Sequence, residues 1–161
     1  MKKAILTGFL WLCSLGVFSQ SITISNSSTG GTWSVPTLSS TITSAGKNYE
    51  HTETTGASHT LIKINSLVVW TVSVSMSTTS NWNSALKLSV RRTGDGTGLV
   101  TISGGTNYIL LSSTPQFFFN GLLGLGFGRD NVPVQYKIEG LSVTLPVKTY
   151  TTTVLYTITG L

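Results

Sequence analysis

The feature that most constrains the fold of this chain is a strict two-residue alternation of side chains between residues 68 and 76. Apolar residues occupy every second position, and valine, threonine or serine stands between them; the apolar positions are Val68, Trp70, Val72, Val74 and Met76. Successive side chains of a strand point to opposite faces, so this period predicts a β-strand with one buried face. The alternation recurs over residues 60–65, 86–91, 132–139, 141–147 and 150–159.

The number and spacing of such segments predict the fold class. With shorter strands at residues 22–25, 99–102, 108–111 and 116–120, we expect about nine or ten strands, which is typical of a sandwich or barrel. One-sided alternation favours antiparallel sheets with one solvated face. Serine and threonine make up 48 of the 161 residues, and threonine on outward positions keeps strand propensity without charge. We therefore expect an all-β, antiparallel β-sandwich of a single domain.

The segments between the predicted strands contain turn residues. Residues 44–58 are polar and contain two glycines, which favours a long loop. Asp95-Gly96 is a strong hairpin signal, and Gly140 is expected to turn the chain between two strands. Residues 121–128 alternate glycine with leucine and phenylalanine, a pattern of either a flexible loop or a strand in close approach to a neighbour.

The first nineteen residues have the pattern of a secretory signal peptide. Two lysines precede an uncharged apolar run over residues 4–18, and Val17 and Ser19 supply small side chains at a cleavage site. We expect cleavage after Ser19, which leaves residues 20–161 as the sandwich domain. The run is short for a membrane span of about 20 residues.

Removal of this signal would change the chemistry of the chain. Cys13 is the only cysteine, so the exported domain is expected to have no disulfide and to depend on its core. Lys2 and Lys3 would be removed together with the signal peptide. The remaining basic residues are scattered, which argues against nucleic-acid binding. We expect a secreted protein, outside the cell or at its surface, without a membrane span in the mature chain.

Few residues could carry out catalysis. The chain has five Asp and Glu and two His, and it lacks the Gly-x-Ser-x-Gly motif of serine hydrolases. Four potential metal ligands fall within ten residues of the sequence: Glu50, His51, Glu53 and His59. Their spacing matches no standard metal motif. We expect no enzymatic activity, no catalytic residue, no metal site and no cofactor.

Aromatic residues in predicted turns and loops are candidate ligand-binding residues. Trp33 and Trp82 stand near turns, and Tyr49 stands in the predicted loop. Such rings can stack on sugars or anchor a partner. The alternative is that they cap one end of the sandwich. Trp70 and Tyr136 are expected to lie in the core.

The last predicted strand is a candidate for assembly. Residues 147–159 carry no charge after Lys148, although soluble proteins usually protect an edge strand with charge or proline. Such an edge could accept a strand from another subunit. The predicted exchange residues are Ile22 and Ile24 in the donor, and Tyr150, Val154, Tyr156 and Ile158 in the acceptor. The alternative is that the two isoleucines pair within their own sheet.

The C-terminal part of the chain has a pattern found in a group of exported proteins. It runs Val134-Gln135-Tyr136-Lys137-Ile138, Gly140-Leu141-Ser142, Leu145-Pro146-Val147-Lys148-Thr149-Tyr150 and Val154-Leu155-Tyr156-Thr157-Ile158. This ending resembles bacterial surface modules of the spore coat protein U and pilin-like kind, without their paired cysteines. It is also similar to WxL-type cell-wall-binding domains, with Tyr156-Thr157-Ile158 in place of the W-x-L. The resemblance implies an immunoglobulin-like sandwich at the cell surface or in fibres, without enzymatic activity.

These observations lead to two functional hypotheses. The first is a secreted structural or adhesive surface protein, pilin-like, which assembles by strand exchange with other copies of itself or with a surface-assembly partner. The alternative is a carbohydrate- or cell-wall-binding module that uses the loop aromatics.

Overall fold

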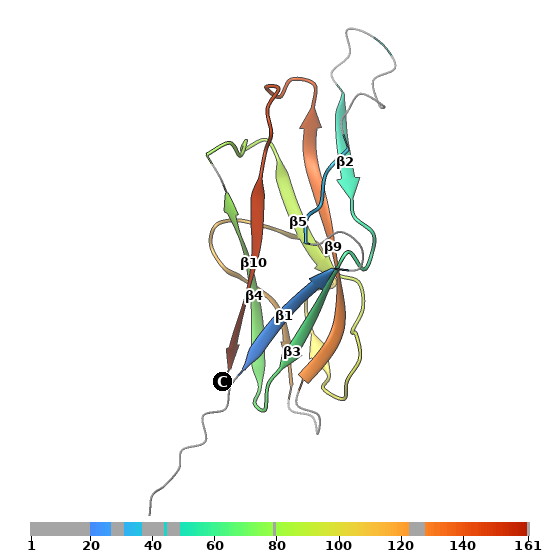
Figure 1. The fold of residues 1–161 in the computed structure, drawn as a ribbon, viewed down its shortest axis with the longest axis vertical. Helices are drawn as coiled ribbons and strands as arrows, with labels where there is room; N and C mark the ends of the chain where they lie inside the picture. Colours follow the sequence, from blue (N-terminus) through green and yellow to red (C-terminus); the bar gives the residue numbers. More distant parts are fainter. Residues whose placement is uncertain are drawn as a thin grey trace, which may run out of the picture.

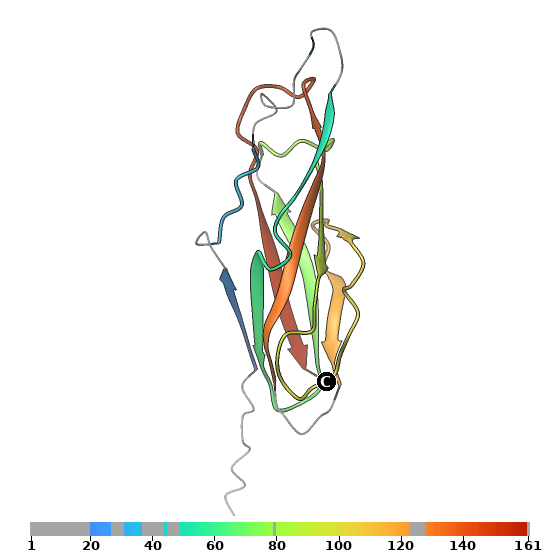
Figure 2. The ribbon, with the colours of Figure 1, turned by 90° about the vertical axis from the view of Figure 1, so that its right-hand side faces the viewer.

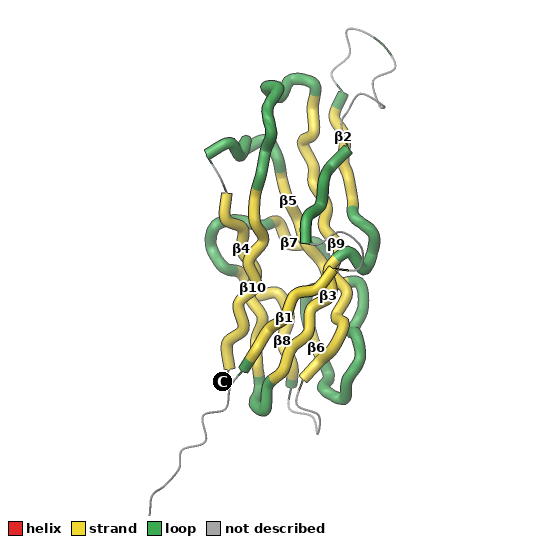
Figure 3. The backbone as a smooth tube through the Cα atoms, viewed as in Figure 1, coloured by secondary structure: helices red, strands yellow, loops and turns green. Residues whose placement is uncertain are grey.

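The chain forms ten strands in two antiparallel sheets that pack face to face, which confirms the all-β sandwich (Figure 1). The computed structural model describes residues 20–26, 31–36, 44, 49–78, 80–122 and 128–160, and the structural statements below concern these residues. None of them lies in a helix, and Figure 3 shows strands joined by loops. The expected signal peptide lies outside the described residues.

The first sheet is built around one long strand. Its order is β1-β3-β9-β5-β7, and β2 also pairs with β9. The strands are β1 (Ser21–Asn26), β2 (Glu50–Thr54), β3 (Thr60–Asn65), β5 (Lys87–Arg92), β7 (Ile109–Leu110) and β9 (Gly128–Ser142). β3 pairs with the first half of β9 and β2 with the second half. The two short strands therefore follow each other along the same edge of β9.

The second sheet has the order β10-β4-β8-β6. Its strands are β4 (Trp70–Thr78), β6 (Ile102–Ser103), β8 (Gln116–Gly121) and β10 (Thr152–Gly160). The two sheets share one core, and Figure 2 shows their strands in a view turned by 90° from Figure 1.

The inward faces of the two sheets supply one hydrophobic core. Most of the apolar positions predicted from the alternation are buried in it; the core consists of Ile62, Ile64, Trp70, Val72, Val74, Leu86, Leu88, Val90, Val100, Ile102, Leu111, Phe118, Phe119, Val132, Val134, Tyr136 and Ile138. The alternation could predict these residues because each antiparallel strand buries only one face.

The expected turn at Gly140 is wrong, because β9 continues through this glycine. The φ angle of Gly140 is +82°, and a Cβ there would collide with the carbonyl oxygen of Ala85. Glycine adopts such a conformation readily, so the strand passes Ala85 at close range and continues to Ser142. Residues 143–151 then form a loop where a further strand was expected.

The expected long loop over residues 44–58 is also wrong in part, because Glu50–Thr54 forms β2. His51 and Glu53 are half-buried and lie 2.5 Å apart, His Nε2 to Glu Oε1. Each satisfies the polar group of the other, so these residues can be partly buried in a strand. The second half of β9 supplies the main-chain partners.

The hairpin expected at Asp95-Gly96 does not form. The chain crosses there from the first sheet to the second, and Thr97 pairs instead with Asp130 of β9. The Thr97 N–H donates to the Asp130 carbonyl at 2.7 Å, and the Asp130 N–H donates back at 2.8 Å. Asp-Gly remains compatible with this longer loop because Gly96 has a φ of +68°.

Candidate functional site

The two lateral sides of the sandwich differ in the length of their edge strands. On one side the sheets end in β6 and β7, which have two residues each. On the other side they end in β10, with nine residues, and in β1 and β2, with six and five. β1 and β10 lie side by side near the C-terminus and diverge from there (Figure 1). We call this second side the open side.

Among the described strands, charged residues and histidines occur only in the first sheet. None of the strands β4, β6, β8 and β10 contains Asp, Glu, Lys, Arg or His, and β1 contains none either. β2, β3, β5 and β9 contain eleven: Glu50, His51, Glu53, Lys63, Lys87, Arg91, Arg92, Arg129, Asp130, Lys137 and Glu139. Of the strands that border the open side, β1 and β10 therefore lack charge and proline, and β2 carries the charged groups.

The main chain of β10 presents hydrogen-bonding groups to the open side. β10 pairs with β4 in an unbroken register in which Val154 lies opposite Met76. The Met76 N–H donates to the Ser112 carbonyl at 2.8 Å, away from β10. Directly opposed residues of an antiparallel pair either exchange both hydrogen bonds or point both groups outward. The N–H and C=O groups of Val154, Tyr156 and Ile158 therefore face the open side.

The predicted acceptor residues have two different positions. Val154, Tyr156 and Ile158 lie on β10 and point inward, where they pack against the core. Tyr150 precedes the strand, and its hydroxyl donates to the Pro146 carbonyl at 2.6 Å. Because the inward side chains already pack against the core, strand addition would use the main chain of β10.

The predicted donor residues pair within their own sheet in this chain. Ile22 lies opposite Ile64 and Ile24 opposite Ile62, both on β3. The side chain of Ile24 remains 45% exposed, whereas Ile22 is half-buried against the core. β1 is thus an edge strand in its own right.

A hydrogen-bonded pair of tyrosines, one on β9 and one on β10, joins the two sheets. The hydroxyl oxygens of Tyr136, on β9, and Tyr156, on β10, lie 2.8 Å apart. The Tyr136 hydroxyl donates to Thr60 Oγ1 at 3.2 Å. Burial raises the pKa of Tyr136, although its hydrogen bonds to Thr60 and Tyr156 lower it. Burial also raises the pKa of Tyr156, and the charge and hydrogen bond of Tyr136 raise it further.

This pair predicts a loss of stability at alkaline pH. Both folded-state pKa values lie above the unfolded value of 10.0, so their contribution is complete below pH 10. Above that pH the unfolded chain loses protons first, and stability falls by up to about 1.4 kcal/mol per pH unit for each tyrosine. Urea unfolding between pH 8 and 11 measures this slope.

Tyr156→Phe should halve that slope and lower the free energy of unfolding at neutral pH by about 1 kcal/mol, because one intersheet hydrogen bond is lost. Tyr150→Phe is the matched control, since its hydroxyl bonds only a nearby loop carbonyl. Equal alkaline slopes in the wild type and Tyr156→Phe would contradict the assignment.

The predicted ligand-binding aromatics are half-buried. Trp33 and Trp82 pack against the hydrophobic core, as the capping alternative expected. The Tyr49 hydroxyl accepts from the Ser44 N–H at 2.8 Å and donates to its carbonyl at 3.1 Å. The two tryptophans therefore contribute to the packing of the sandwich, and Tyr49 is bonded to a nearby loop residue.

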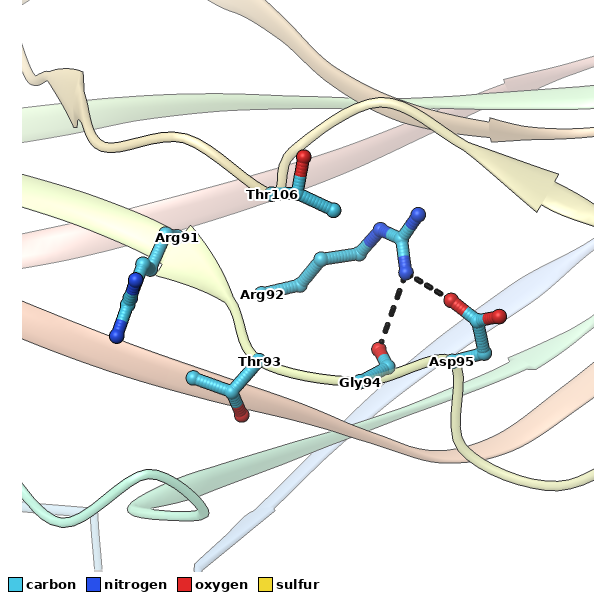
Figure 4. Close-up of a pocket in the computed structure, with 6 residues that line it drawn as sticks. All are labelled: Arg91, Arg92, Thr93, Gly94, Asp95 and Thr106. Carbon is cyan, nitrogen blue, oxygen red and sulfur yellow. Dashed lines mark hydrogen bonds and ion pairs between the residues drawn. The ribbon is translucent and has the colours of Figure 1, made fainter.

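Two arginines that the sequence argument missed hold the loop between β5 and β6. Arg92 is buried, and its Nε donates to the Gly104 carbonyl at 2.5 Å. Its Nη1 donates to the Gly94 carbonyl and pairs with the Asp95 carboxylate (Figure 4). Arg129 donates to four carbonyls of the same loop, those of Asp95, Gly96, Gly98 and Val100.

The shallow polar pocket beside Arg92 is part of this scaffold. It is lined by Arg91, Arg92, Thr93, Gly94, Asp95 and Thr106. Figure 4 shows the two arginine side chains leaving the strand in opposite directions, with Arg92 directed at Asp95. Because the pocket's buried cation is already paired with loop atoms, we assign it to loop fixation.

Neither a metal-binding cluster nor a membrane-spanning helix is present among the described residues. No group of three or more His, Cys, Asp or Glu is placed to hold a metal ion. No described helix is long and apolar enough to cross a membrane.

Comparison of the chain with protein-family models, curated proteins and solved structures found no match.

Proposed function

We propose that this chain is a secreted, non-enzymatic structural or adhesive protein of the cell surface, pilin-like in kind, which assembles by accepting a β-strand at β10. The observation that carries the proposal is the nine-residue, uncharged, proline-free edge of β10 on a sheet whose strands contain no charge. Export follows from the signal-like N-terminus.

Strand addition suits this edge physically. An unpaired row of N–H and C=O groups is a template for another strand, and natural proteins usually block it with lysine, proline or a short edge. The opposite side of this sandwich has such short edges. The lack of charge and proline on β10 itself favours an edge that is used in assembly.

Lysines on β10 are expected to weaken self-association. Leu155→Lys/Thr157→Lys places two charges on exposed, outward positions of the edge strand, where they repel an added copy. We expect the dissociation constant to rise about tenfold. Sedimentation over a range of concentrations measures it, on protein expressed as the full chain and recovered after export.

The matched control places the same two charges elsewhere on the same face. Ser73→Lys/Ser77→Lys lies on β4, one strand in from the edge, and should associate like the wild type. A wild-type protein that stays monomeric at every concentration would overturn the proposal, as would equal association of the two lysine variants. Deleting residues 21–26 tests β1 as donor, because only a β1 donor makes association depend on them.

A further inference from the structure

We propose that the strand added at β10 is β10 of a second copy, running antiparallel, so that two sandwiches form a closed dimer with one continuous eight-stranded sheet. This inference rests on the proposed function and names its partner and register. It requires no donor segment to leave its own sheet.

The uncharged edge makes β10 a suitable partner for itself. In a symmetric dimer the same patch meets itself, so any charge on the edge strand would face or approach its own copy. β10 avoids this repulsion because it contains no charged side chain and no proline. The charged strands of the first sheet, such as β9 and β5, could not pair with themselves in this way without like charges coming close.

Main-chain geometry selects the centre of the pairing. The groups of Val154, Tyr156 and Ile158 face the open side, and Tyr156 is the middle residue of Thr152–Gly160. A two-fold axis beside Tyr156 therefore places it opposite itself and places Val154 opposite Ile158 of the second copy. These three pairs provide about six main-chain hydrogen bonds.

The same register pairs the outward side chains favourably. Leu155, which is 47% exposed, comes opposite Thr157 of the second copy on the outer face. That pair is of the non-hydrogen-bonded type, in which the Cα atoms lie about 4.5 Å apart. Contact with the threonine methyl would cover part of the exposed leucine.

The neighbouring strand limits how far the pairing extends. Gln20, just before β1, lies against Gly160, and a Cβ on that glycine would collide with the Gln20 side chain. The central segment Val154–Ile158 is farther from this contact. A register centred on Tyr156 brings only the first residue of the second β10 opposite Gly160.

The geometry of the edges also sets the stoichiometry. An isologous contact uses the β10 edge of both copies and leaves neither β10 edge free, so growth through β10 stops at two. The other end of the second sheet is β6, whose two residues offer no comparable template. An edge contact of this size belongs with weak, transient interfaces.

Cysteine crosslinking tests the register. Each variant is made as the full chain with Cys13→Ser, so the introduced cysteine is the only one. Leu155→Cys and Thr157→Cys should each crosslink poorly alone, because neither residue faces itself. An equal mixture should form a disulfide-linked dimer, since a Cα separation of about 4.5 Å permits the bond. Mixing Thr153→Cys with Thr157→Cys is the register control. It should give no more disulfide-linked dimer than either variant alone.

Charge exchange tests the same pairing without cysteine. Leu155→Lys/Thr157→Glu places Lys opposite Glu twice in the dimer and should associate at least as tightly as the wild type. Leu155→Lys/Thr157→Lys should be about tenfold weaker. If both variants lose association and the cysteine mixture does not crosslink, β10 accepts some other strand: the symmetric dimer is overturned and the proposed function stands. If neither variant loses association, both are overturned.

Discussion

Trp70→Ala is expected to lower the free energy of unfolding by about 3–5 kcal/mol, the range for deleting a large buried aromatic ring. Trp70 begins β4 and is only 1% exposed. Its ring packs edge-to-face on Phe119, with centroids 5.8 Å apart at 86°. Alanine would leave a cavity between the sheets. Urea unfolding followed by circular dichroism measures this loss as a lower denaturation midpoint, with the dependence of the free energy on urea concentration unchanged.

Gly121 supplies the control, because it lies opposite Trp70 on β8 and a Cβ there would collide with the indole. Gly121→Ala alone should cost about 1–3 kcal/mol by overpacking. In the Trp70→Ala background the methyl group points into the cavity, so the double variant should be more stable than the sum of the two single changes predicts. Strict additivity would contradict this packing.

Local alternation predicted most of the fold because one-sided burial leaves a signal in every long strand. β3 has the predicted bounds, and β10 has the predicted inward residues. The alternation also assigned Tyr136 and Tyr156 to inward faces. Their hydrogen bond could not be predicted, because it depends on which strands of the two sheets face each other.

The features that the sequence argument missed depend on contacts between distant segments. The sequence of β2 is polar and resembles that of a loop. It forms a strand because it pairs with the second half of β9 and because His51 bonds Glu53. The edge position of β10 was part of the assembly hypothesis, and the strand order confirms it. Only the strand order identifies β4 as the neighbour of β10 and shows that the edges on the opposite side are short.

The burial of Arg92 could have been predicted from the alternation of β5. It continues the inward phase of Leu88 and Val90, and the structure buries it to 6% exposure. The preceding residue, Arg91, is half-exposed. Alternation places neighbouring residues on opposite faces, so one of the two had to point inward.

Arg92→Ala is expected to lower the free energy of unfolding by about 3 kcal/mol, because a buried cation and its charge-assisted hydrogen bonds are lost together. The carbonyls of Gly94 and Gly104 would lose their donor. The aliphatic stem of the side chain would also leave a gap at this end of the core. Urea unfolding measures the loss, and hydrogen exchange of residues 93–105 should show faster exchange than in the wild type.

Arg91→Ala is the matched control, because the neighbouring side chain is half-exposed and lies over the Tyr108 ring on the other face of the strand. It should cost less than about 1 kcal/mol. Asp95→Asn should also cost less than about 1 kcal/mol, since the Asp95 side chain is 60% exposed and the carbonyl acceptors remain. If Asp95→Asn proved as destabilising as Arg92→Ala, the ion pair would be what stabilises the loop. A large loss in Arg92→Ala alone would instead assign that role to the carbonyl contacts and the buried stem.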